Sequence, residues 1–188
     1  MDFLTALWLP ILLSAVLVFV ASSLLHIVLP FHRGDHRRLP GEEELLAAMR
    51  EHGVERGVYL FPCPASIQDA AGEEMQEKYR RGPVGWMTVL PNGPIRMGRS
   101  LLHWFLFTLL IGIFAGYVLW HAVPAGADYL AVFRLAGGLG FLAYGIPALQ
   151  DSIWKGQPLS ITLKFVFDGL VYALVLAGCF AGFWPAPV

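Results

Sequence analysis

The residues of this chain best suited to chemistry are polar side chains that interrupt long apolar runs. His26 lies near the end of one run, His103 near the start of the next, and Asp168 within the last. In hydrocarbon, an ionisable side chain usually faces a protein interior or a wet cavity, and by default it marks a candidate functional site. Imidazoles can bind haem iron or relay protons, and a carboxylate can titrate or pair with a cation. The use of these groups depends on whether the fold brings them together.

These side chains can contact one another only if they lie at a similar depth in the membrane. His26 and His103 are each expected about three residues inside the same membrane boundary, so they should be level with one another. Asp168 is expected about one turn deeper, four residues after Lys164. A polar cluster at the inner leaflet is therefore predicted, with further members Lys164, Ser22, Ser23 and Thr108.

Three hypotheses for this cluster remain open. In the one we favour, Lys164 and Asp168 form an i, i+4 ion pair while the histidines snorkel or hydrogen-bond between helices. The second is a haem or quinone site in which His26 and His103 are two ligands from facing helices. The third is a proton or solute path with Asp168 as the titrating group and a histidine as relay, and lipid binding is a further alternative. The sequence offers only one aspartate for such a path and predicts no broken helix.

Catalytic motifs are scarce in the sequence. It contains no GxSxG, no HExxH, no paired CxxC and no phosphate-binding glycine loop. His26, His32 and His36 are spaced by six and four residues but straddle a helix end and a proline, so no metal site is predicted. We expect a protein that is not an enzyme, with no catalytic residues and no resident cofactor unless the haem hypothesis holds.

Composition defines the elements that must position these residues. The 188 residues are 56% hydrophobic and only 14% charged, well below the charge of a soluble domain. Apolar runs long enough to cross a bilayer predict an all-α membrane protein with four transmembrane helices. The first lies within residues 1–29, and the others lie within 100–188, at about 101–120, 129–149 and 162–184.

The polar stretch 30–99 between the first two spans is predicted to be a small α/β insert. Residues 41–52 and 67–81 have helical patterns, while 57–61 and 83–90 are typical of strands closed by proline-rich turns. Acidic residues are interspersed with its arginines and lysines, so no nucleic-acid partner is expected. About 69 residues bury little core, so the insert is predicted to be marginally stable alone.

Charge predicts the orientation. Ten of the 13 lysines and arginines fall in the stretch 31–99, and the turn 121–127 contains none. By the positive-inside rule, the insert is cytoplasmic and both termini lie on the outer side.

Small residues predict how the helices pack in lipid, because they let backbones approach closely. The second span has a GxxxG step and the fourth has a ladder of four small residues: Gly112, Gly116, Gly169, Ala173, Ala177 and Ala181. Arg134, about five residues inside the third span, is expected either to snorkel to headgroups or to contact a partner chain.

Four segments resemble a family of small four-span bacterial inner-membrane proteins that are generally labelled uncharacterised. They are HIVLPFHRGDHRRLP from His26, PNGPIRMG from Pro91, LLHWF from Leu101 and DSIWKG from Asp151. The resemblance implies a multi-pass protein of the bacterial inner membrane and supplies no catalytic residues. Our functional hypothesis is an accessory or scaffolding subunit of a larger membrane assembly, with the lipid bilayer and other membrane subunits as partners. The alternative is a small redox or transport protein that uses His26, His103 and Asp168.

Overall fold

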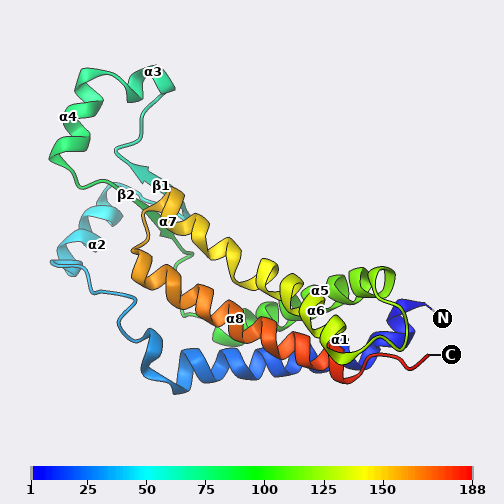
Figure 1. The fold of residues 1–188 in the computed structure, drawn as a ribbon. Coiled ribbons are helices and arrows are strands. Elements are labelled where there is room, and N and C mark those ends of the chain that lie inside the picture. The colour runs from blue at the N-terminus through cyan, green and yellow to red at the C-terminus, as the bar shows by residue number, and fades with distance from the viewer. Residues whose placement is uncertain (1, 188) are drawn as a thin grey trace. The chain divides into compact units, whose positions relative to one another are not determined.

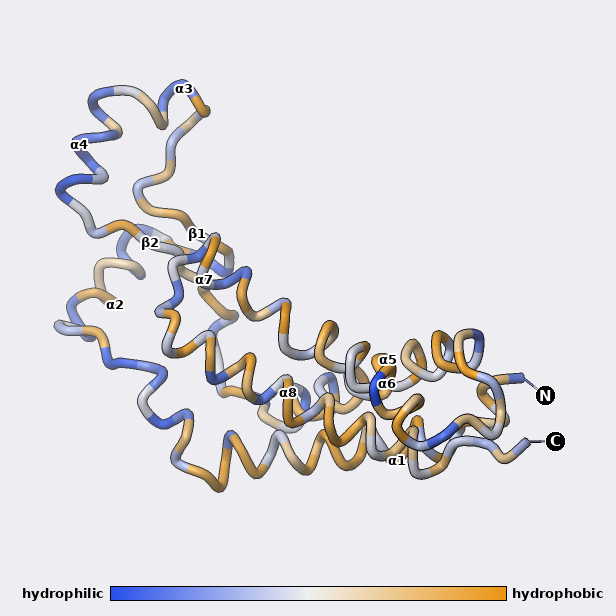
Figure 2. Tube along the Cα trace, in the orientation of Figure 1, coloured by the Kyte–Doolittle hydropathy of each residue, from blue (hydrophilic) through white to orange (hydrophobic). Residues whose placement is uncertain are grey.

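The computed structural model describes residues 2–187 and is mostly helical, with one small sheet (Figure 1). Four segments are long and apolar enough to cross a membrane: Phe3–Val28, Met97–Ala122, Tyr129–Lys155 and Leu159–Gly182. Apolar residues dominate these segments, as the colouring of Figure 2 shows. The four helices indicate a multi-pass membrane protein.

The long helices form a bundle in which the contacts are uneven. Helix α1 (Phe3–Ser23) packs against both α5 (Met97–Ala122) and α8 (Leu159–Gly182), and α8 also packs along α6 (Tyr129–Tyr144). Contact between α5 and α6 is much more limited. The two ends of the chain lie at the same end of this bundle (Figure 1).

Glycines allow the closest helix contacts. A Cβ atom on Gly140 would lie 2.9 Å from the Cα atom of Ala173, and one on Gly169 would collide with the backbone of Gly145. On the opposite side of the bundle, a Cβ on Gly112 would lie 3.2 Å from the carbonyl oxygen of Ile11. The small residues singled out in the sequence therefore lie at helix interfaces, as do the buried Ala173, Ala177 and Ala181 of α8.

Two of the four spans end irregularly. Helix α1 continues into a π-helical turn, η1 (Leu24–Val28), followed by a 3-10 turn, η2 (Pro30–His32). The third span is interrupted after α6 by a 3-10 turn, η3 (Ile146–Ala148), and resumes as α7 (Leu149–Lys155). The expectation that no helix is broken is wrong, because Pro147 lacks the N–H that a continuous α-helix needs at this position.

Residues His36–Ile95 form a separate compact unit. Its helices are α2 (Glu42–Glu51), α3 (Ile67–Ala70) and α4 (Glu73–Arg81), and its strands are β1 (Gly57–Phe61) and β2 (Gly85–Val89). The strands pair antiparallel, with Gly57 opposite Val89 and Phe61 opposite Gly85. One helix was expected over 67–81, whereas the structure has two, separated at Ala71 and Gly72. Within the described chain, Met75 is the only large apolar residue of this unit that is fully buried.

Candidate functional site

Three side chains converge on one point at the end of the bundle where α1 ends and α8 begins. The Oδ2 atom of Asp168 lies 2.9 Å from Nε2 of His32 and 3.6 Å from Nε2 of His26. Asp168 is 2% exposed and His32 is 10% exposed, while His26 is 39% exposed. We call these three residues the His–His–Asp cluster; all of their facing nitrogen and oxygen atoms lie within 4.8 Å of one another.

The irregular end of the first span places His32 in this cluster. His26 lies in the π turn η1, and Pro30 begins the 3-10 turn that carries His32. This sharp change of direction brings the two imidazoles into a parallel stack, with ring centroids 4.2 Å apart and planes inclined by 7°. A regular helix through residue 32 would carry that side chain away from His26, so the two non-α turns create the pair. Turns of the π type occur frequently at functional sites.

Each histidine is oriented through its Nδ1 atom. Nδ1 of His26 lies 3.1 Å from the carbonyl oxygen of Ser22, and Nδ1 of His32 lies 2.6 Å from Oδ2 of Asp35. A carbonyl and a carboxylate can only accept hydrogen bonds, so both Nδ1 atoms carry the proton. In the neutral imidazole, Nε2 then has a free lone pair, and in both rings it is the atom that faces Asp168.

Asp35 is held in turn by Lys164. The Nζ atom of Lys164 donates to Oδ1 of Asp35 and, at 2.8 Å, to the carbonyl oxygen of Phe31. Hydrogen bonding from Lys164, opposed in part by burial, lowers the pKa of the Asp35 carboxyl. The favoured sequence hypothesis paired Lys164 with Asp168, and this is corrected: Lys164 reaches back to the turn after α1 instead, leaving the Asp168 carboxylate to the two histidines.

The hydrogen-bonding capacity of Asp168 is not met by the protein. Within residues 2–187, neither oxygen of Asp168 has a hydrogen-bond partner, and neither does Nε2 of His32. Nε2 of His32 nevertheless lies 2.9 Å from Oδ2 of Asp168, within the range of an ion pair. Buried polar atoms are nearly always paired in proteins, so this site is set up to receive another group.

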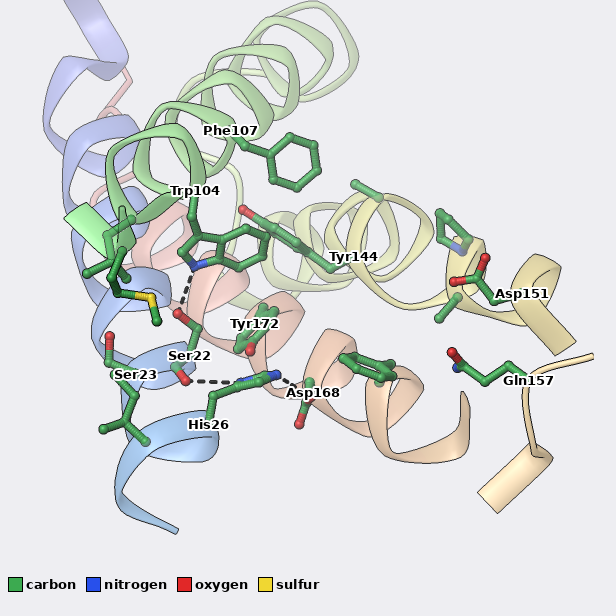
Figure 3. A pocket seen from close by; sticks show the side chains of 17 residues that line it. Ser22, Ser23, His26, Trp104, Phe107, Tyr144, Asp151, Gln157, Asp168 and Tyr172 are labelled. Carbon is green, nitrogen blue, oxygen red and sulfur yellow. Dashed lines mark hydrogen bonds and ion pairs between the residues drawn. The ribbon is translucent and has the colours of Figure 1, made fainter. Parts of the chain in front are cut away.

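A cavity of about 900 Å³ adjoins the cluster (Figure 3). His26 and Asp168 form part of its wall, together with a stripe on α5 that includes Trp104 and Phe107 and a stripe on α6 and α7 that includes Tyr144. Its lining includes residues of both α5 and α6, two helices that have few contacts with one another. Its wall is mainly apolar, with a few polar groups directed inward, which is typical of a small-molecule site.

Two tyrosine hydroxyls add to the unpaired groups in this cavity. Within the described residues, the hydroxyls of Tyr144 and Tyr172 are buried and have no hydrogen-bond partner. Their rings pack edge to face, with centroids 5.6 Å apart, and both rings also contact Trp104. Trp104 is fixed by a 2.8 Å hydrogen bond from its Nε1 to Oγ of Ser22.

The other residues of the predicted polar cluster are distributed differently. His103 is exposed and is not part of the His–His–Asp cluster, so the structure does not bring His26 and His103 together as a ligand pair. Ser23 bonds to the carbonyl of Phe19 in its own helix, and the Thr108 hydroxyl contacts the carbonyls of Phe105 and Ala15. Arg134 is exposed on α6 and forms no ion pair with any residue between 2 and 187.

Sequence reasoning missed His32 and Asp35 as site residues, and with them the two tyrosines. A signal for the first pair was present: a histidine and an aspartate three residues apart directly after Pro30 can bond across one tight turn. The tyrosines gave no comparable signal, because tyrosine is common near membrane interfaces.

Comparisons with protein-family models, with curated proteins and with solved structures find no match to this chain. The chemistry of the site is therefore derived from its own geometry.

Proposed function

We propose that this protein binds a lipophilic small molecule in the cavity between α5, α6 and α8, and that the head of this molecule carries oxygen atoms that accept hydrogen bonds. A quinone has this chemistry. The observation that carries the proposal is that three residues in the wall of an otherwise apolar cavity, Tyr144, Tyr172 and Asp168, have buried polar atoms without a hydrogen-bond partner among residues 2–187.

The dimensions and chemistry of the cavity support a ligand of this class. Small-molecule sites span roughly 300–1,000 Å³ and combine apolar walls with a few oriented polar groups. The two tyrosine hydroxyls are donors suited to ring carbonyls, and Trp104 offers an aromatic face beside them. A lipophilic ligand could enter from the bilayer where α5 and α6 have few contacts.

Equilibrium binding of a short-chain quinone analogue to the detergent-purified full chain tests this function. We expect saturable binding that Tyr144→Phe and Tyr172→Phe each weaken about tenfold, the loss of one hydrogen bond of about 1.4 kcal/mol. Tyr117→Phe is the matched control, because Tyr117 is exposed on α5 and does not line the cavity. Absence of saturable binding, or equal affinity in all three variants, would refute the proposal.

We further propose that the chain resides in a bacterial inner membrane with residues 30–99 in the cytoplasm and both termini outside. The charge distribution supports this orientation. Cys63 is exposed and Cys179 is buried, which provides a direct test. A membrane-impermeant maleimide added to intact spheroplasts should not label Cys63, whereas it should label an Ala125→Cys variant in a Cys63→Ser background. Labelling of Cys63 in sealed spheroplasts would show that the orientation is the reverse of the one proposed.

An accessory or scaffolding role in a larger membrane assembly is the second candidate function, and Arg134 favours it. An exposed arginine within a membrane span, without an ion pair among residues 2–187, suits a carboxylate on a partner chain. Extraction in a mild detergent should yield stoichiometric membrane subunits, and Arg134→Ala should release them. Recovery of the wild-type chain without other subunits would contradict this role while leaving the quinone proposal intact.

A further inference from the structure

We infer that the His–His–Asp cluster is a binding site for a divalent transition-metal cation, with Nε2 of His26, Nε2 of His32 and a carboxylate oxygen of Asp168 as ligands. Two imidazoles and a carboxylate are a ligand set that suits zinc or ferrous iron. This inference does not depend on the identity of the molecule that occupies the cavity.

Two of the three separations between the donor atoms are close to those of a metal site. With bonds of about 2.0–2.1 Å in tetrahedral geometry, neighbouring ligand atoms are about 3.3 Å apart. The observed separations from Asp168 Oδ2 are 2.9 Å to His32 and 3.6 Å to His26. The two Nε2 atoms lie within 4.8 Å of one another. The imidazole planes are stacked and inclined by only 7°, so one ring has to turn before both Nε2 lone pairs point at one ion, and His26, the most exposed of the three, has room to do so.

The ring atoms that face the carboxylate support a metal ion. Both Nδ1 atoms contact acceptors, the Ser22 carbonyl and the Asp35 carboxylate, so Nε2 is the ring atom left to bind a further group. In both histidines this Nε2 faces Oδ2 of Asp168, at 2.9 Å for His32 and 3.6 Å for His26, so a cation between these atoms would contact all three.

The surroundings have the features of a second coordination shell. A histidine that binds a metal usually donates its other N–H to a carboxylate or a backbone carbonyl, and here one histidine does each. Lys164 pairs with Asp35, so within the described residues the two histidines are the ion-pair partners of the buried Asp168. A divalent cation bound among these three side chains would compensate the charge of an Asp168 carboxylate and retain one positive charge.

The three ligands leave at least one coordination position open. His26 and Asp168 line the cavity, so an additional ligand would come from that side (Figure 3). Three protein ligands with an open position distinguish sites that bind water or a small molecule from closed structural sites. We therefore assign the open position to water or to an oxygen of the cavity ligand.

Cobalt binding provides the test, because Co²⁺ in a site of low coordination number gives visible absorption. The full chain is purified in detergent through a tag without histidine, stripped with a chelator and titrated with Co²⁺. We expect one Co²⁺ per chain, displaced by Zn²⁺, and a rise in thermal stability upon Zn²⁺ binding. Asp168→Asn and His32→Gln should each abolish the Co²⁺ spectrum. Asp35→Asn should retain the spectrum but weaken the affinity for Co²⁺ 10- to 100-fold.

His103→Gln is the matched control, because His103 is exposed near the same end of the bundle but outside the cluster. It should bind Co²⁺ as the wild type does. If Asp168→Asn does not fold, His26→Gln replaces it, since His26 is partly exposed and its loss should disturb packing least. No cobalt spectrum in the wild type, or an unchanged one in the folded cluster variants, would overturn the inference. Quinone binding without metal binding would overturn it and leave the proposed function standing.

Discussion

The two ends of the helical bundle differ in how their interiors are filled. At the end that holds the termini, all four long helices meet around an apolar core that includes Leu7, Leu119, Val132 and Phe180, each fully buried. At the opposite end, α5 and α6 enclose a cavity instead, and Asp168 is buried with unpaired oxygens. One end is fully packed, whereas the other has buried polar atoms without a hydrogen-bond partner among the described residues.

This contrast indicates that stability and ligand binding depend on opposite ends of the bundle. At the end that holds the termini, the apolar side chains are buried against one another, so no ligand is required to complete the packing there. Unpaired buried polar atoms are unfavourable until a ligand, a cation or water pairs them. Substitutions at the packed end should therefore change stability, whereas those at the cavity end should change binding more than stability.

Truncation of one phenylalanine at each end should give the largest contrast. Phe180→Ala removes a fully buried ring and should lower the free energy of unfolding by about 3–5 kcal/mol. Phe107→Ala, at the cavity wall with a side chain that is 43% exposed, should lower it by about 1 kcal/mol or less. Denaturant unfolding of both variants in the same detergent measures the difference. Equal losses would mean that the two ends are packed alike.

The second largest loss of stability is expected at the glycine contact between α8 and the interrupted third span. Gly169→Ala would force a methyl group into the backbone of Gly145 and should cost about 3 kcal/mol. Gly178→Ala is on the same helix with open space around it, so it should be neutral or stabilise by up to about 1 kcal/mol. Thermal unfolding compares the pair. A harmless Gly169→Ala would show that the two helices do not cross this closely.

The partner of Lys164 can be identified with two double-mutant cycles. Lys164→Met combined with Asp35→Asn should show a coupling energy of about 1–3 kcal/mol, because the two side chains are in direct contact. Lys164→Met combined with Asp168→Asn should show a smaller coupling energy, because Lys164 is connected to Asp168 only through Asp35 and His32. The reverse pattern would restore the i, i+4 pair expected from the sequence.

The hydrogen bond from Trp104 to Ser22 should have the smallest effect. Trp104→Phe and Ser22→Ala should each destabilise by about 1 kcal/mol, and the double variant should lose little more than either alone. Ser23→Ala is the control, because its hydroxyl bonds only within its own helix. Additive losses in unfolding free energy would show that the two residues do not form this bond.

Local features of the sequence predicted most elements of this fold, but not the break between α3 and α4 or the turn η3 in the third span. Hydropathy and run length predicted four spans, and the boundaries of β1 and α2 lie within two residues of those expected. Their success has a simple reason: helix length, β-propensity and turn residues are properties of neighbouring residues. The small residues of α8 were likewise predicted to lie at interfaces, since small side chains permit close approach wherever they occur.

Only the tertiary structure decided which polar groups meet. Depth placed His103 level with His26, but depth does not determine the direction in which a side chain leaves its helix around the bundle axis. That rotation is set by packing, such as the contact of Gly169 with Gly145, and by the π and 3-10 turns after α1. The pairing of Lys164 with Asp35, 129 positions away, and the convergence of His32 on Asp168 follow from these long-range contacts, which no local pattern encodes.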